Sequence, residues 1–199
     1  MKTYSVHYSA ALDLETAGVL EDFSFPWLDR TCPWTSFRAV WNRELMRFRF
    51  EVADDDLVLD ESGEPHAAAL GSDRVELFFA TSADLSTPYY GAEMEPRGSV
   101  YDYKAIYHRQ FDDTWAFAGL TFAGELLEGG YLVEGTIPLE ELRALGCLKG
   151  NEMITGVYRA EFSHGPDGVV QDWISWIDPQ VEKPDFHVPS SFGKFLFLD

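Results

Sequence analysis

The chain has 199 residues, and its 34 Asp and Glu residues against 15 Lys and Arg residues give a formal net charge of −19. Such an acidic surface repels nucleic-acid phosphates and anionic lipids, so we expect no nucleic-acid partner and no membrane partner. Apolar residues make up 46% of the chain, which is enough for a sizeable core. We therefore expect a single domain over residues 1–199, of an oligomeric state that the sequence does not predict.

The sequence contains neither a clear targeting signal nor a cysteine pattern that predicts a disulfide or a metal site. No apolar run approaches the roughly 20 residues that a membrane-spanning helix needs. The segment from Met1 to Glu15 lacks the apolar stretch of a signal peptide, which favours a cytoplasmic protein, or a secreted or periplasmic one whose signal has been removed. Cys32 and Cys147 are too few for a disulfide framework and lack metal-site spacing, so both are expected to be free thiols.

Alternating apolar residues predict an all-β fold. In residues 45–52, Met46, Phe48 and Phe50 alternate with polar side chains, and a short polar connection joins this strand to residues 37–41 in a hairpin. Seven more strands are expected, at residues 74–80, 100–107, 115–122, 131–137, 154–162, 172–176 and 194–198. Strands in this number, separated by turn-rich gaps, predict a distorted antiparallel β-sandwich of the jelly-roll type.

One short helix is expected at residues 138–145. Pro138 stands at its first turn, Glu140 and Glu141 follow, and Gly146 ends it. Residues 53–72 and 165–193 are expected to be irregular and exceed ordinary loop length, so they are the first places to look for function.

Charged residues occur inside strands that otherwise resemble core. In residues 74–79, Glu76 and Phe78 face one side and Val75 and Leu77 face the other, and Arg159 lies in a similar strand. Sugar sites combine planar charged groups, which bind hydroxyls, with aromatic rings, which cover the C–H face of a pyranose. Paired carboxylates also serve glycoside hydrolases, so both classes stay open.

The acidic loop at residues 53–61 is the candidate metal site. Together with Asp73 it offers the hard oxygen ligands that Ca²⁺ prefers, although it does not match the EF-hand pattern. We select Asp55 and Asp73 as candidate ligands. The alternative is an ordinary solvated loop.

Seven segments, in order along residues 37–198, resemble the family 9 carbohydrate-binding modules that accompany xylanases. Residues 1–36 diverge from the pattern. The matching segments are the hairpin at 37–54, Asp73-Arg74-Val75-Glu76-Leu77-Phe78-Phe79, the Tyr-rich residues 89–98 with their Pro-x-Gly turn, residues 129–138, Tyr158-Arg159-Ala160-Glu161, residues 174–179 and residues 185–193.

The resemblance implies a β-sandwich with structural calcium that clamps a terminal sugar between two tryptophans. Here the two clamp positions hold Leu70 and Phe186, and the positions of polar contacts hold three glutamates. Nearby aromatic residues, Trp115 among them, are candidates for a substitute platform or for core packing. The candidate sugar contacts are Leu70, Glu76, Tyr90, Glu93, Glu95, Arg159, Trp176, Phe186 and His187.

The resemblance therefore implies a non-catalytic domain that recognises a mono- or oligosaccharide of plant-type glycans. A glycoside hydrolase that uses two of the carboxylates is the second hypothesis. Related sandwich folds also bind haem through a Met and a His, and the third hypothesis is a haem site built from Met94 with His187 or His108.

Overall fold

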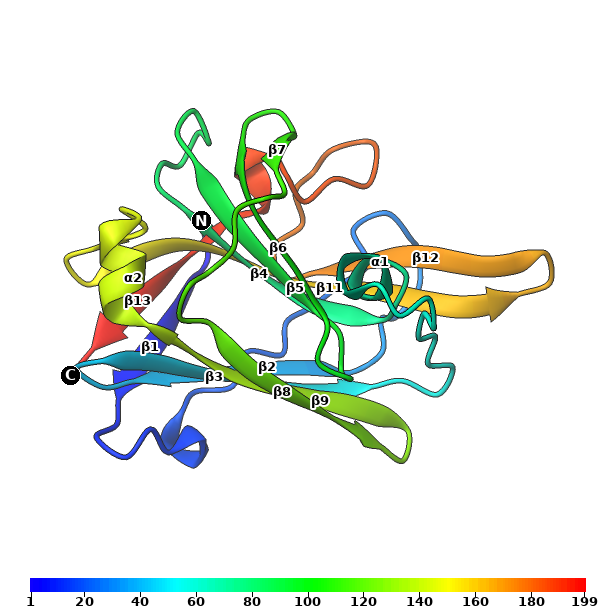
Figure 1. Ribbon diagram of the computed structural model, residues 1–199, viewed down its shortest axis with the longest axis horizontal. Coiled ribbons are helices and arrows are strands. Elements are labelled where there is room, and N and C mark those ends of the chain that lie inside the picture. Colours follow the sequence, from blue (N-terminus) through cyan, green and yellow to red (C-terminus); the bar gives the residue numbers. More distant parts are fainter.

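Thirteen strands form one continuous curled sheet in the computed structural model, which describes residues 1–199 (Figure 1). The longer strands are β1 (Thr3–Tyr8), β2 (Thr35–Trp41), β3 (Leu45–Ala53), β4 (Arg74–Ala80), β5 (Tyr89–Met94), β6 (Val100–Ile106), β8 (Thr121–Leu127), β9 (Gly130–Pro138), β11 (Glu152–Gly165), β12 (Gly168–Ser175) and β13 (Gly193–Leu198). The short elements are β7 (Gln110–Asp112), β10 (Leu148–Lys149), helices α1 (Pro65–Leu70) and α2 (Leu139–Ala144), and two 3₁₀ turns, Leu14–Thr16 and Pro189–Ser191.

The sheet folds over to make two layers. Its order is β7-β6-β5-β4-β11-β13-β1-β2-β3-β9-β8, and Figure 1 shows β4, β5, β6 and β11 lying across from β2, β3, β8 and β9. Strand β1 connects the two halves because it pairs with both β13 and β2, and it is parallel to each. All other strand pairs are antiparallel, so the predicted sandwich is confirmed with this one parallel strand added.

The main core fills the space between the layers. Alternate residues of β2, β3 and β9 meet alternate residues of β4, β5 and β11, and Phe37, Phe50 and Phe195 pack in one aromatic group. This is the burial that the alternation of β3 predicts, since Met46, Phe48 and Phe50 are all fully buried. Most of the hydrophobic stabilisation of the fold comes from this layer contact.

A second apolar cluster covers the outer face of the β4-β5-β6-β11 layer. Phe78, Tyr103 and Tyr158 project from the strands, and residues 176–192 fold back so that Phe186 and Phe192 pack on them. The ring of Phe186 stacks on Tyr158 at 4.2 Å between centroids, with an interplanar angle of 12°. This layer is therefore buried on both faces, and every residue of β4 and β5 is buried.

The expected strand at residues 115–122 is wrong. The strand β8 begins only at Thr121, and the preceding residues form a loop in which Trp115 and Phe117 pack beside Tyr90. Carboxylates take the backbone N–H groups that a neighbouring strand would otherwise bind: Asp102 accepts from Phe117, and Glu141 accepts from residues 118 and 119. The apolar alternation here reflects packing of a loop against the core.

The helix after Pro138 is confirmed as α2, whereas α1 and β1 are additions to the expected elements. Helix α1 lies inside the stretch expected to be irregular, with Pro65 at its start and Gly71 after its end. Strand β12 occupies part of the second such stretch. Neither helix has the length and apolar character needed to cross a membrane. Cys32 and Cys147 are free thiols, as expected.

Gly124 of β8 provides a test of how the two layers close. A Cβ added to it would lie 2.6 Å from Cα of Pro96, in the turn after β5. Because this is a backbone atom, no change of side-chain rotamer can relieve the contact. We expect Gly124→Ala to lower the free energy of unfolding by about 1–3 kcal/mol. Gly18→Ala, whose Cβ would meet nothing within 4 Å, is the control, with an expected change within about 0.5 kcal/mol. Chemical denaturation of both variants measures this, and equal stability would contradict close packing at Gly124.

Candidate functional site

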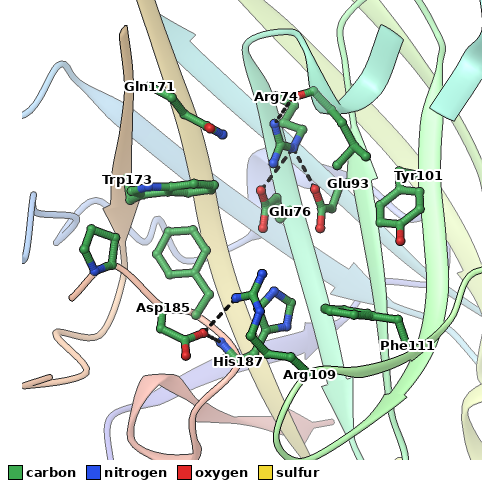
Figure 2. A pocket seen from close by; sticks show the side chains of 13 residues that line it. Arg74, Glu76, Glu93, Tyr101, Arg109, Phe111, Gln171, Trp173, Asp185 and His187 are labelled. Carbon is green, nitrogen blue, oxygen red and sulfur yellow. Dashed lines mark hydrogen bonds and ion pairs between the residues drawn. The ribbon is translucent and has the colours of Figure 1, made fainter. Parts of the chain in front are cut away.

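A cavity of about 460 Å³ opens on the outer face of the layer, between β4, β5, β6, β12 and the segment that carries Phe186. Its aromatic lining residues are Tyr101, Phe111, Trp173 and Phe186. Its polar lining residues are Arg74, Glu76, Glu93, Arg109, Gln171, Asp185 and His187, and Leu70 and Pro184 complete the wall. Figure 2 shows these side chains converging on the cavity, with Gln171 and Trp173 on one side of it and Glu93 and Tyr101 on the other. The volume is within the range of small-molecule sites.

Arg74, Glu76 and Glu93 form the polar floor of this cavity. Glu76 on β4 lies directly opposite Glu93 on β5 in the register of the sheet. The Nε atom of Arg74 donates a hydrogen bond to Glu93 Oε2 at 2.8 Å and lies 3.1 Å from Glu76 Oε1. All three side chains are at least 94% buried. One guanidinium therefore serves two carboxylates, and Figure 2 shows the second oxygen of each pointing away from Arg74.

Burial governs the protonation of this floor. It raises the pKa of Glu76 to about 8, and the charge of Glu93 adds to the rise while Arg74 opposes it. Burial also raises the pKa of Glu93, against the lowering effect of Arg74. Two adjacent carboxylates in a desolvated site share protons in this way because both cannot be ionised cheaply.

The aromatic side chains that line the cavity differ in how much of each side chain is exposed. Trp173 and Tyr101 are half-buried and Phe111 is exposed, whereas Phe186 is only 4% exposed. Phe186 has one face on Tyr158, and the ring of Trp173 lies against it edge-on at 5.3 Å with an interplanar angle of 88°. Trp173 is therefore a better stacking surface for a ligand than Phe186.

The rim of the cavity is held by Asp185. This carboxylate contacts His108 Nε2 at 2.6 Å and Arg109 Nη1 at 3.1 Å, and it accepts a hydrogen bond from the backbone N–H of His187. Burial acts to raise the pKa of Asp185, but the hydrogen bonds from His108 and His187 outweigh it and the pKa is lowered. Burial lowers the pKa of His187 to about 3, so this imidazole is neutral, and it lies 3.0 Å from the hydroxyl of Tyr89.

Five of the sequence-predicted contacts line this one cavity. They are Leu70, Glu76, Glu93, Phe186 and His187. They come from three separate parts of the chain, so the fold brings them together as the family resemblance implies.

The other four predicted contacts lie away from the cavity. Tyr90 and Trp176 belong to the core between the layers, where Trp176 packs near Phe195. Glu95 is fully buried and accepts hydrogen bonds from the backbone N–H groups of Arg97 and Ser99, so it stabilises the turn after β5. Arg159 projects from β11 on the face opposite Tyr158 and therefore toward the inside of the sandwich.

Arg159 lies beside a buried acidic cluster made of Asp54, Asp73 and Glu161. Carboxylate oxygens of these three residues lie within 4.8 Å of one another. Arg159 pairs with Asp54 at 3.2 Å and also with Glu161. Asp55, one of the two predicted ligands, is exposed and outside the cluster, and its neighbour Asp54 occupies the inward position.

Desolvation is the main influence on the pKa values of Asp73 and Glu161 in the acidic cluster. It raises the pKa of Asp73 to about 7, although the backbone N–H groups of Phe162 and Val58 oppose this by donating to the carboxylate. Burial likewise raises the pKa of Glu161 to about 8, against the lowering effect of Arg159. With Arg159 as the one cation beside them, Asp73 and Glu161 therefore tend to hold protons near neutral pH.

Several cavity residues were not among the predicted contacts. Trp173 and Gln171 lie two residues apart on β12, so they share a face, and Tyr101 lies on β6. The alternation in these strands could have indicated a shared face, but not which face borders a cavity. Arg109 and Asp185 are 76 residues apart, and their pairing has no sequence signal.

The haem hypothesis is wrong, because the fold keeps Met94 apart from both histidines. Met94 is fully buried in the core between the layers, whereas His187 lines the cavity on the outer face of the same layer. His108 lies outside that core, in the turn between β6 and β7. Neither histidine reaches the side of the sheet on which Met94 lies, so neither pair can bind one iron.

The polar floor makes stability depend on pH. Because the pKa of Glu76 rises from 4.5 to about 8 on folding, its proton stabilises the folded state below pH 4.5, and this contribution is lost as the pH rises through about 8. Gln at this position mimics the protonated acid. We expect Glu76→Gln to become more stable relative to the wild type as the pH is raised across this window, as measured by urea denaturation. A constant difference at all pH values would show that folding does not raise the pKa of Glu76.

Comparison with known proteins agrees with this architecture. The chain matches the family described as "Carbohydrate family 9 binding domain-like" over residues 16–198. A candidate carbohydrate-binding protein from Bacteroides uniformis has a similar structure, with a TM-score of 0.72 and 16% sequence identity over 98% of this chain and 99% of that one. A sequence search of curated proteins finds no match to this chain.

Two further structures are of a family 9 carbohydrate-binding module from Caldicellulosiruptor kristjanssonii. The complex with cellotriose has a TM-score of 0.60 and 18% identity, over 99% of this chain and 94% of that chain. The complex with glucose has a TM-score of 0.57 and 20% identity, over 98% and 95%. These likenesses establish the fold, and the family match extends over nearly the whole sequence. The resemblance seen in the sequence is thereby confirmed: this chain belongs to the carbohydrate family 9 binding domain-like family.

Proposed function

We propose that the cavity binds a mono- or oligosaccharide of the glucose type and that the protein breaks no bond in it. The observation that carries this proposal is the convergence of partly exposed aromatic rings and planar charged groups in one cavity. Family membership and the cellotriose and glucose complexes of its structural neighbours support the class of ligand. The sugar itself is our inference for this chain.

The cavity offers complementary partners for a pyranose. The ring of Trp173 supplies a flat apolar surface for the C–H face of the sugar. Hydroxyl groups then find charged hydrogen-bonding partners in Glu76, Glu93 and Arg109. Phe186 supports Trp173 from below, so it contributes to the shape of the site more than to direct stacking.

The arrangement of the carboxylates favours binding without hydrolysis. A glycosidase needs two carboxyl groups that flank the scissile bond. Glu76 and Glu93 instead lie side by side on neighbouring strands and contact the same nitrogen of Arg74. The remaining carboxylate, Asp185, is engaged by His108, Arg109 and the backbone of His187.

We further propose that the acidic cluster holds the structural calcium that the family resemblance implies. The donor set fits this ion, because carboxylate oxygens are its preferred ligands. The charges fit as well: three carboxylates balanced by one guanidinium leave two negative charges, which is the charge that one Ca²⁺ neutralises. Asp54, Asp73 and Glu161 would hold it, and Arg159 would orient Asp54 and Glu161.

Trp173 provides the test of sugar binding. Loss of a stacking face worth about 1–2 kcal/mol should weaken binding of glucose and cello-oligosaccharides roughly 5- to 30-fold in Trp173→Ala. Trp34→Ala, which removes an exposed tryptophan outside the cavity, should bind as the wild type does. Isothermal titration measures both, and chromatography of the same mixtures detects any cleavage. Unaltered binding by Trp173→Ala would refute the site, and turnover would refute the non-catalytic assignment.

The calcium proposal predicts a metal-dependent melting temperature. At a concentration 100 times its dissociation constant, a bound ion adds about 2.7 kcal/mol, which corresponds to roughly 5–10 °C in a protein of this size. We expect melting in a chelator to be lower by that amount than melting in excess Ca²⁺. Glu161→Gln should lose the response, while Asp55→Asn, an exposed neighbour of the cluster, should keep it. Identical melting temperatures of the wild type with and without Ca²⁺ would contradict the site.

A further inference from the structure

Glu76 is a buried carboxylate without a hydrogen-bond partner at its Oε1 atom, and it lines the ligand cavity. It is 1% exposed, and no group donates a hydrogen bond to this buried oxygen. The single N–H of Arg74 Nε is directed at Glu93, so Arg74 offers Glu76 only its charge, at 3.1 Å. The other oxygen, Oε2, points away from Arg74 (Figure 2) and also accepts no hydrogen bond from the protein. Because polar atoms at such buried positions are almost always paired, a donor for Oε2 would have to come from a ligand in the cavity.

When Glu76 and Glu93 are both ionised, the polar floor is one positive charge short. Arg74 is the only cation in direct contact with Glu76 and Glu93. Arg109 faces the floor from the β6-β7 turn, but it is paired with Asp185 at the rim. His187 is neutral, and Tyr103 presents a buried hydroxyl. Two like charges placed directly opposite each other on neighbouring strands repel, so the floor favours a ligand that brings a cation.

Resting on the proposed sugar-binding function, we propose that the ligand is an amino sugar whose free primary ammonium group binds between Glu76 and Glu93. A hydroxyl has one hydrogen to donate, whereas an ammonium has three and can serve both carboxylates at once. It would also replace the proton that the floor otherwise holds near neutral pH. Charge-assisted hydrogen bonds of this kind are about twice as strong as neutral ones.

Two other features favour a cationic sugar over a neutral sugar or a simple amine. The net charge of −19 attracts cations to the whole molecule. Trp173 and Tyr101 flank the floor with ring surface that a small aliphatic amine would leave uncovered (Figure 2). The expected ligand thus combines a pyranose ring with an unacetylated amine, as in glucosamine and its oligosaccharides.

The test compares glucosamine, glucose and N-acetylglucosamine by isothermal titration with the complete chain at pH 7 and low salt. We expect glucosamine to bind at least 10-fold more tightly than glucose, and N-acetylglucosamine to bind no more tightly than glucose. Added salt should narrow the difference, because it screens the ionic contact. Ethanolamine, which carries the same amine without a ring, should bind much more weakly than glucosamine.

The outcomes separate this inference from the function on which it rests. Glucose binding as tightly as glucosamine, or ethanolamine binding equally well, would overturn the amino-sugar assignment and leave a neutral-sugar or amine site. No binding of any sugar would overturn the proposed function as well. The comparison uses the wild type, so it decides the question even where a variant fails to fold.

Two variants test whether the preference for glucosamine arises at the polar floor. In Glu76→Gln the ratio of glucosamine affinity to glucose affinity should fall toward one, because the extra carboxylate is gone. Glu182→Gln removes the same charge from an exposed position outside the cavity, and it should keep the wild-type ratio. An unchanged ratio in Glu76→Gln would show that the preference does not arise at the polar floor.

Discussion

The structure depends on a strand layer that is buried on both faces. Strands β4, β5 and β11 pack against the opposite layer on one side and against Tyr103 and residues 176–192 on the other. A sheet with one wet face can carry charges there at little cost, but a layer covered twice cannot. Every buried charged residue in these strands must therefore find a partner within the protein or in a ligand. This constraint explains why the chemistry of the molecule is concentrated in so few residues.

Two arginines meet this constraint, one at each face of the layer. Arg74 serves Glu76 and Glu93 on the outer face, and Arg159 serves Asp54 and Glu161 on the inner face. In both places the carboxylates outnumber the guanidinium. Buried ion pairs contribute little to stability in themselves, since desolvation offsets much of the attraction. The excess of carboxylates at both places is more simply understood as a site for an additional cation. On the inner face this would be a metal ion, and on the outer face a charged group of the ligand.

The parts that were predictable from the sequence are those in which neighbouring residues decide the outcome. The alternation at residues 45–52, the hairpin before it and the helix after Pro138 each depend on local pattern. Strand β1 has only six residues and is ordered by partners nearly the whole chain length away, so it carried no comparable signal. At residues 115–122 the same alternation was present, but Asp102 and Glu141 bound the backbone and prevented strand pairing.

The candidate site shows the same division. The family motif selected Glu76 and Glu93, and both line one cavity because they lie opposite each other in regular paired strands. It did not reveal Trp173, since its exposure depends on how residues 176–192 fold back over the sheet. Asp54 and Asp55 are adjacent in sequence, and only the inward turn of the backbone after β3, where the N–H of Asp54 donates to the carbonyl of Gly129, separates the cluster member from its exposed neighbour.

The bridge at Asp185 has a consequence for how ligand preference can diverge among related chains. It ties the β6-β7 turn to the segment before β13 through side chains alone, and no strand pairing joins them. Changes in either segment can therefore reshape the mouth of the cavity without disturbing a ladder of backbone hydrogen bonds. Strands β4, β5 and β11, which are buried on both faces, tolerate no such changes. Evolution of new specificity in this architecture should accordingly proceed at the rim, with the floor inherited almost unchanged.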